Sequence, residues 1–425
     1  MIPSIIARSI PAALLAAVLL PAGAPLAQQA LPAIPASNAR VRQAMETLKA
    51  DNAWTLDQQV SICEIAAPPF MEEVRAAEYK RRLEALGLTN VRIDSEGNVI
   101  AERKGTGNGP VVVLSAHLDT VFPEETDVKT RNEGDVIHGP GIGDDCRGLA
   151  VLLSVARAMN QASIATNGTI LFIGTVGEEG PGNLRGVRHL FESELKGKVD
   201  YFLSVDGTGL NITHAAVGSH RYRVTYSGPG GHSYGAFGMP NPIHALGRAI
   251  SKFAEMTVPR SPRTTFSVGI VEGGTSVNSI AFSASMDVDM RSELQSSLDE
   301  VDAQFRVAVQ EALEEERARW PNSQRAIEVK IDTIGIRPAG TQPETAPIVV
   351  TAVNAGKALG FEPYLSPSST DSNIPIALGI PAITIDGGGQ GRGAHSLDET
   401  YRDGPEGWKG PQWALLIVSA LAGVQ

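Results

Sequence analysis

The chain has 425 residues, of which 42% are hydrophobic and 20% charged, a composition typical of globular proteins. This length exceeds what a single hydrophobic core ordinarily supports, so we expect two domains. The net charge of −11 at pH 7 excludes nucleic acid and anionic membrane surfaces as expected partners.

The first 27 residues have the pattern of a secretory signal peptide. Arg8 supplies a positive charge, an apolar stretch runs from Ile10 to Leu20, and small residues precede the expected cleavage after Ala27. A membrane anchor is the alternative, but the apolar stretch is shorter than the ~20 residues that a membrane span needs. We therefore expect a secreted or periplasmic protein with no membrane span after cleavage.

Helices and buried strands alternate in the region that follows. Two helices are predicted over residues 40–60 and 72–87, and residues 91–102 have the pattern of a β-hairpin. Apolar, β-branched runs then predict buried strands, and amphipathic segments between them predict helices. These strands are expected near 111–116, 168–175 and 200–205, and the helices over 144–161 and 183–195. This alternation predicts an α/β domain whose mostly parallel sheet has helices on both faces.

The pattern changes between residues 214 and 336. Half-exposed alternating strands and two amphipathic helices, over 241–256 and 296–320, predict a smaller α+β domain. The α/β pattern returns afterwards, with a helix over 346–360, a strand over 381–386 and a closing helix over 410–424. We therefore expect a catalytic domain formed by residues 28–213 and 337–425, interrupted by an inserted domain at 214–336.

Cys63 and Cys146 are the two cysteines of the chain. Export would permit a disulfide between them. Their spacing in sequence does not decide the matter, because disulfide geometry depends on the fold. A disulfide, two separate thiols, and a Cys146 thiol beside a metal site remain open.

Acidic and histidine side chains recur where buried strands end or a helix begins. They are His117 and Asp119, Asp144 and Asp145, Glu178 and Glu179, Asp206, and His395. Ligands collect beyond the carboxyl ends of strands in parallel sheets. Imidazole and carboxylate groups suit zinc and related metals, and a pair of metals about 3.5–4 Å apart requires terminal ligands, a shared carboxylate and a free base. The pattern thus predicts a dinuclear metal hydrolase.

Each motif also has a structural alternative when taken alone. His117 and Asp119 fall on the same side of an extended chain, which suits a carboxylate that orients a ligand imidazole or a simple ion pair at a strand end. Of the adjacent aspartates at 144 and 145, one can cap the following helix while the other bridges two metals. The acids at 178 and 179 can divide the roles of ligand and base, or form a solvated charged loop.

With these motifs in order, the chain resembles the zinc metallopeptidase family of peptidase T, carnosinase, aminoacylase and succinyl-diaminopimelate desuccinylase. The resemblance covers about residues 50–420, and it implies two zinc ions per subunit, with cobalt and manganese as alternatives. It implies that one zinc is bound by His117 and Asp206 and the other by Glu179 and His395, with Asp144 bridging both. Asp144 keeps the family's spacing from the preceding glycines, although the lysine common soon after this aspartate is absent.

The resemblance also implies catalytic and substrate-binding roles. Asp119 would orient His117, and Glu178 would be the general base. The inserted domain falls where the family has its dimerisation domain. His232 in this domain would reach the active site of the partner subunit in a homodimer and polarise the scissile carbonyl or stabilise the oxyanion. Asn278 and Arg291 would contact the substrate, with a strand-face ion pair as the alternative role for Arg291.

The expected activity is zinc-dependent hydrolysis of short peptides by an exopeptidase of aminopeptidase or tripeptidase type. The aspartate at position 206 is similar to the residue found there in the aminopeptidase and dipeptidase branches of the family, whereas the carboxypeptidase and deacylase branches have glutamate. An N-acyl amino acid deacylase or a carboxypeptidase of the same family is the alternative. A more remote alternative is a binding protein without catalytic turnover. The complete set of metal ligands and the presence of a general base, Glu178, argue against it.

Overall fold

The computed structural model describes residues 31–323 and 325–425. The predicted signal peptide lies outside the described residues and remains a prediction. Within the described ranges, no helix combines the length and the apolar character that crossing a membrane requires.

The larger sheet has nine strands, and its central strands are parallel. In spatial order it contains β1 (Thr89–Ile93), β2 (Val99–Arg103), β6 (Thr169–Thr175), β3 (Val111–His117), β7 (Tyr201–Val205), β17 (Ala382–Ile385), β8 (Ile212–Ala216) and β15 (Gly340–Thr341), and β16 (Leu365–Ser368) also pairs with β8. Strands β6, β3, β7 and β17 run parallel, and β1 and β2 form the predicted hairpin. The predicted α/β class with a mostly parallel sheet is confirmed.

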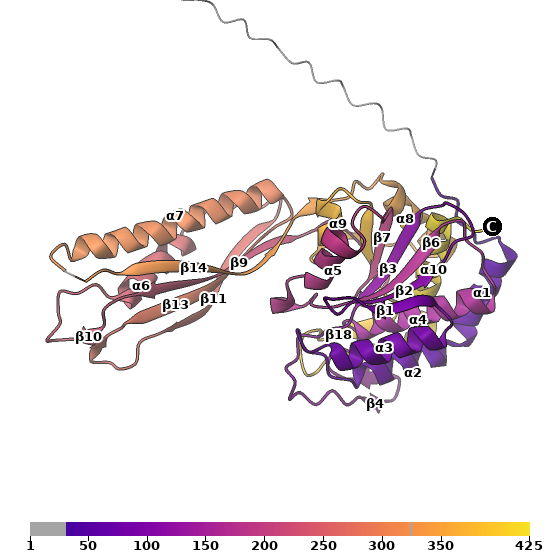
Figure 1. Cartoon of the computed structure of the whole chain (residues 1–425), viewed down its shortest axis with the longest axis horizontal. Coiled ribbons are helices and arrows are strands. Elements are labelled where there is room, and N and C mark those ends of the chain that lie inside the picture. The colour runs from indigo at the N-terminus through magenta and orange to yellow at the C-terminus, as the bar shows by residue number, and fades with distance from the viewer. Residues whose placement is uncertain (1–30, 324) are drawn as a thin grey trace, which may run out of the picture. The chain divides into compact units, whose positions relative to one another are not determined.

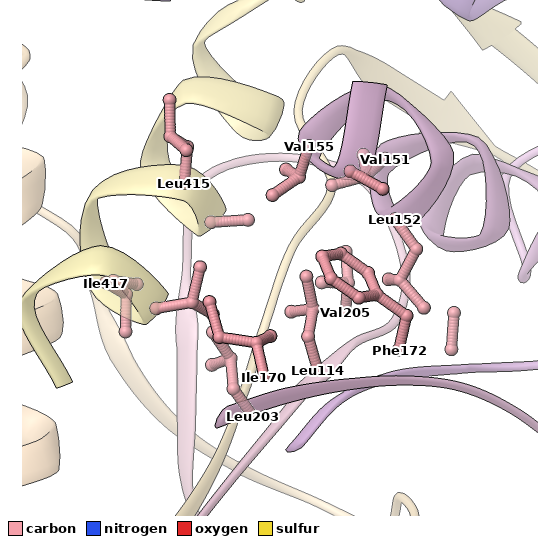
Figure 2. Packing of buried hydrophobic residues seen from close by; sticks show 14 of the residues in the cluster. Leu114, Val151, Leu152, Val155, Ile170, Phe172, Leu203, Val205, Leu415 and Ile417 are labelled. Atoms are coloured by element: carbon pink, nitrogen blue, oxygen red, sulfur yellow. The ribbon is translucent and has the colours of Figure 1, made fainter. Parts of the chain in front are cut away.

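Helices cover both faces of this sheet, because successive side chains along each strand point to opposite faces and both faces carry apolar residues. Val112 and Leu114 pack into the cluster under α4 (Cys146–Gln161) and α10 (Lys409–Ala422), as Figure 2 shows for Leu114. Val113 packs into a separate cluster with α5 (Arg185–His189). The remaining helices around this sheet are α1 (Ala39–Ala50), α2 (Asn52–Cys63), α3 (Glu73–Ala85), α8 (Pro347–Ala358), α9 (Asn373–Ala377), a π-helical turn (Leu190–Glu194) and two 3₁₀ turns (Gly180–Gly182 and Gly404–Glu406).

Two predicted helices differ from those observed. The helix predicted over 40–60 is divided at Asp51, which leaves the helical conformation between α1 and α2. Aspartate and asparagine compete with the helix for backbone hydrogen bonds, and Asn52 follows directly. The helix predicted over 183–195 begins only at α5, because Asn183 and Leu184 both have positive φ, 52° and 60°.

A second sheet lies between the two parts of the α/β region in sequence. Its strands are β11 (Thr264–Gly273), β13 (Ser283–Ser292), β9 (Gly218–Ser227) and β14 (Glu328–Arg337), in that spatial order. The helices α6 (Pro242–Ala254) and α7 (Gln295–Arg319) pack on it (Figure 1). The core between these helices and the sheet contains Tyr222, Phe253 and Phe305. A two-stranded ladder, β10 (Gly231–His232) with β12 (Ser279–Ile280), belongs to the same region.

A small four-stranded sheet was not predicted. It contains β18 (Gln390–Arg392), β19 (Thr400–Arg402), β5 (Val136–His138) and β4 (Arg131–Glu133). By pairing β19 with β5, it brings the glycine-rich turn after His138 beside the loop that carries His395. The Gly139 amide donates to the Glu399 carbonyl at 3.0 Å in the same place. This sheet therefore joins two segments that are far apart in sequence.

Cys63 and Cys146 form a disulfide. Both side chains are buried, and their Cα atoms are 5.5 Å apart. The bond ties the end of α2 to the first residue of α4. Of the three arrangements left open by the sequence, the structure therefore has the first.

Candidate metal centre

The predicted metal-binding side chains follow adjacent strands of the central sheet. His117 is the last residue of β3, Asp206 follows β7, and Glu178 and Glu179 follow β6. These three strands are parallel neighbours, so their carboxyl ends lie at one edge. Strand order thus brings together residues that are separated by up to about ninety positions in sequence.

Asp144 lies between two imidazoles. His117 Nε2 is 2.9 Å from Asp144 Oδ1, and His395 Nε2 is 3.1 Å from Asp144 Oδ2. Burial opposes ionisation of this carboxyl, yet the hydrogen bonds from the two histidines hold its pKa below its usual range. Its two oxygens therefore face two different nitrogen donors, as a bridging carboxylate would.

Two possible ligand sets share this aspartate. One set contains His117, Asp144 and Asp206, the other contains Asp144, Glu179 and His395, and within each set the ligand atoms lie within 4.8 Å of one another. The His395 Nε2 atom is 3.0 Å from Glu179 Oε1, and His117 Nε2 is 4.0 Å from Asp206 Oδ1.

The charges of these groups also favour cations. Burial, followed by the negative charge of Asp144, raises the pKa of Asp206 well above its usual value. Hydrogen bonds to Asp144 and Glu179 raise the pKa of His395 to about 10. Uncompensated carboxylates next to imidazoles form a donor set that fits a pair of zinc-class ions.

Asp145 has different partners from Asp144, although a single peptide bond separates them. Its Oδ1 accepts from the Gly148 amide at 3.0 Å, capping α4, and its Oδ2 accepts from the His117 amide at 3.0 Å. The sequence predicted that one of the two adjacent aspartates caps the following helix, and in the structure that residue is Asp145. It also holds the backbone of His117.

Glu399 fixes the turn that carries Asp144, and the sequence reasoning missed it. Its carboxylate accepts from the amides of Gly141 and Gly143, both at 2.8 Å, and from the Asp144 amide at 3.2 Å. Burial is the main reason that the pKa of Glu399 is raised to about 7. Its position four residues after His395, in the same loop, was the one available signal.

Asp119 contacts both neighbouring motifs. Its main-chain carbonyl accepts from His117 Nδ1 at 2.9 Å, while its carboxylate Oδ1 lies 3.7 Å from that nitrogen. The carboxylate accepts from the amides of Glu178 and Glu179, at 3.0 and 2.8 Å. The contact to the imidazole is therefore made by the backbone, and the side chain organises the two glutamates.

Glu178 is buried and forms an ion pair that the sequence did not suggest. Arg337 Nη1 donates to Glu178 Oε1 at 2.9 Å and to Ser369 Oγ at 3.0 Å, and Nη2 donates to the Glu178 carbonyl. Burial raises the pKa of Glu178 to about 8, although the Arg337 charge opposes this shift. Arg337 is the last residue of β14, and no motif in its neighbourhood marks it.

The cavity over these residues has a volume of about 670 Å³. The metal-site residues that line it are Asp144, Glu178, Glu179, Asp206 and His395, and three arginines, Arg221, Arg291 and Arg337, also line it. Arg221 Nε and Arg291 Nε share one carboxylate, Asp289, at 2.9 and 2.7 Å. The predicted substrate residue Arg291 thus lies at the cavity and also makes the strand-face ion pair that was its alternative role.

His232 and Asn278 are not among the residues that line this cavity. Both are exposed and adjacent to one another, where the Ser233 amide donates to the Asn278 carbonyl at 2.9 Å. The described chain therefore does not bring these two predicted site residues to its own metal centre.

Comparison with known proteins identifies relatives of this arrangement. The profile of Peptidase family M20/M25/M40 matches residues 113–407. Carboxypeptidase G2 from a Pseudomonas species is 29% identical over 339 residues, covering 76% of this chain and 77% of its own.

Solved structures share the fold. The aminopeptidase PepT from Bacillus cereus superposes with a TM-score of 0.67 at 21% identity, covering 89% of this chain and 98% of its own. A dinuclear metal-binding peptidase of the M20 family from Bacillus subtilis superposes with a TM-score of 0.63 at 21% identity, covering 88% and 98%.

Proposed function

Because the chain belongs to Peptidase family M20/M25/M40, and is therefore a hydrolase, we propose that it is a dinuclear metal-dependent exopeptidase acting on short peptides. The observation that carries the proposal is the position of Asp144, whose two oxygens face His117 and His395. We propose zinc as the metal, held by His117 and Asp206 on one side and by Glu179 and His395 on the other. Cobalt and manganese are the alternatives with the same ligand preferences.

Bound metals would supply a water of lowered pKa and a Lewis acid for the scissile carbonyl. The chain's own residues perform the proton transfers and the positioning. Glu178 takes the proton of the attacking water and returns it to the leaving amine. Asp119 holds the amides of Glu178 and Glu179, so the base and the neighbouring ligand keep a fixed relation. Arg337 occupies Oε1 of Glu178 and leaves its other oxygen for the water.

The arginines of the cavity support a substrate that carries a carboxylate. Arg221 and Arg291 together place two positive charges beside the single negative charge of Asp289. The Arg291 guanidinium is suited to bidentate binding of a carboxylate. A peptide C-terminus meets this requirement, and so does an N-acyl amino acid, so deacylation or carboxypeptidase activity is the second candidate.

We further propose a homodimer in which His232 and Asn278 act at the partner's cavity. Their exposure, and their absence from the cavity of their own chain, support this arrangement. There, His232 would donate to the oxyanion that develops on the carbonyl oxygen. Export to the periplasm or the medium is also proposed, on the pattern of residues 1–27. Fractionation of cells expressing the full chain tests it.

A mass-spectrometric turnover panel tests the function. The purified chain with zinc would be offered free dipeptides and tripeptides, amino-blocked peptides and N-acyl amino acids, with Glu178→Ala as the blank. Release of the N-terminal residue from free peptides alone supports the exopeptidase of aminopeptidase type. Cleavage of the N-acyl compounds alone would replace it by the deacylase, and zinc binding without any turnover would argue against both.

A further inference from the structure

Asp386 lies at the same sheet edge as the candidate metal ligands, and the roles described above do not use it. It follows β17, the parallel neighbour of β7, and Ile385 is the register partner of Val205. Asp386 therefore stands beside Asp206, on the side away from His117. Neighbouring strands are about 4.8 Å apart, so Asp386 lies about one strand spacing beyond a candidate metal ligand.

Only one of the two carboxylate oxygens of Asp386 accepts hydrogen bonds from the described part of the chain. Its Oδ2 accepts from the Asn211 amide at 2.9 Å and from Asn211 Nδ2 at 2.8 Å. In the described part of the chain no donor reaches Oδ1, and no cationic side chain forms an ion pair with Asp386. Burial raises the pKa of this group to about 7 because no positive charge offsets it. A partly buried carboxylate without a cation is stabilised when a ligand supplies one.

The cavity has the opposite charge elsewhere. Asp386 lines it together with Thr208, Asn211 and Thr213, whereas Arg221 and Arg291 line the part formed by the second sheet. The two arginines share a single carboxylate, so that part carries a net positive charge. One cavity thus offers a site for an anion and a site for a cation, in addition to the candidate metal ligands. A zwitterionic substrate matches both.

We propose that Asp386 binds an ammonium group of the substrate, so that the enzyme selects peptides with a free amino group on the acyl side of the scissile bond over neutral acyl compounds. This inference rests on the proposed hydrolytic function and specifies its substrate class. The competing role is purely structural, in which Asp386 anchors the turn at Asn211. That role uses Oδ2 alone and needs no negative charge, because an amide oxygen accepts the same two hydrogen bonds.

The test uses a substrate pair that differs by one ammonium group. Alanyl-leucine and propanoyl-leucine have the same chain length and the same carboxylate, and propanoyl-leucine lacks the amine. We compare the ratio of their kcat/KM values in the zinc-loaded wild type, Asp386→Asn and Asp386→Ser. Asp299→Asn, an exposed aspartate on α7, is the matched control for loss of one charge. Zinc content and thermal unfolding establish that each variant is folded and loaded.

In the wild type the ratio should favour alanyl-leucine, and in Asp386→Asn it should fall about tenfold or more, the scale expected for one hydrogen bond between charged groups. Turnover of propanoyl-leucine should change little, and Asp299→Asn should retain the wild-type ratio. An equal loss on both substrates would assign Asp386 to the turn alone and overturn the proposal. An unchanged ratio in both Asp386 variants would also overturn it.

A failure of the hydrolytic function is distinguishable from a failure of the ammonium site. If the wild type hydrolyses neither compound, equilibrium titration of alanyl-leucine and propanoyl-leucine into the zinc-loaded protein replaces turnover. Tighter binding of the amine compound that is lost in Asp386→Asn then supports the site without the reaction. Equal binding of the two compounds by the wild type refutes it.

Discussion

Asp144 and Asp145 provide a matched comparison at the scale of single residues. Asp144 faces both histidines, whereas Asp145 caps α4 and holds the His117 amide. Asp144→Ala should therefore abolish binding of at least one metal with little change in the stability of the metal-free fold. Asp145→Ala should destabilise the fold by about 0.5–2 kcal/mol, the usual range for losing an N-cap. Metal content by mass spectrometry and stability by denaturant unfolding distinguish the two variants. If Asp145→Ala lost the metal and Asp144→Ala lost stability, the roles of bridging ligand and helix cap would be reversed.

Arg337 gives a second prediction at this scale, concerning pH. Its charge opposes the rise in the pKa of Glu178, so Arg337→Met should raise that pKa further. A general base acts only when deprotonated, so the acidic limb of the kcat/KM profile should move to higher pH. Arg337→Lys, which keeps the charge but not the two-pronged contact, should move the limb less. A profile that keeps its acidic limb while the rate falls would mean that Arg337 acts on geometry alone.

At the scale of elements, the disulfide joins α2 to α4 beside the Asp145 cap. It closes a loop across a sequence separation of 83 residues. Loops of this size restrict the unfolded chain enough to contribute about 4 kcal/mol to stability. Cys63→Ser with Cys146→Ser should therefore lose stability on this order in denaturant unfolding. The wild type should show the same loss after reduction, whereas the double variant should not respond to the reductant.

The elements that sequence patterns predicted are those with strong, local signals. Buried runs such as that of β3 predicted the parallel core, and the position of His117 at its end predicted the edge where ligands meet. The small sheet of β4, β5, β18 and β19 was not predicted, because its strands are three residues long and largely polar. The ion pair of Arg337 with Glu178 was not predicted for a different reason: the two residues are 159 positions apart, and only the fold brings them together.

At the scale of the whole molecule, the charge of the metal centre should make the stability of the metal-free protein depend on pH. Burial, the first cause in each case, raises the pKa values of Glu178 and Glu399 to about 8 and 7. It also raises the pKa of Asp371, a buried aspartate that accepts a hydrogen bond from Thr175 at the end of β6, to about 6. Between the unfolded values near 4 and these folded values, the native state binds more protons than the unfolded state. Its stability therefore decreases as pH rises through this window.

Thermal unfolding of the chelated protein should accordingly show a melting temperature that falls from about pH 5 to about pH 8. Adding zinc should reverse the trend, because metal binds the deprotonated ligands and stabilises the native state. Replacing Glu178 by Gln should reduce the slope in the chelated protein. A chelated protein whose stability rises over this range would contradict the charge balance described for the site.

The proposed dimer makes a prediction about mixed subunits. His232→Ala and Glu178→Ala should each be nearly inactive as homodimers. In a heterodimer, one cavity combines an intact Glu178 with the partner's intact His232. Refolding an equimolar mixture should then recover about a quarter of the wild-type activity, since half of the dimers are mixed and one of their two sites is complete. No recovery in heterodimers isolated by differential tags would mean that His232 acts within its own chain or does not act in catalysis at all.

The pairing of Ser219 with Arg337 has a consequence for the history of the chain. These register partners lie near the start of β9 and at the end of β14, so the polypeptide leaves the α/β region and re-enters it at nearly the same point. A segment whose two ends are adjacent can be gained or lost in a single genetic event without rethreading the surrounding fold. Arg337, the last residue of β14, is also the partner of Glu178. Any such recombination would have had to preserve or replace this contact.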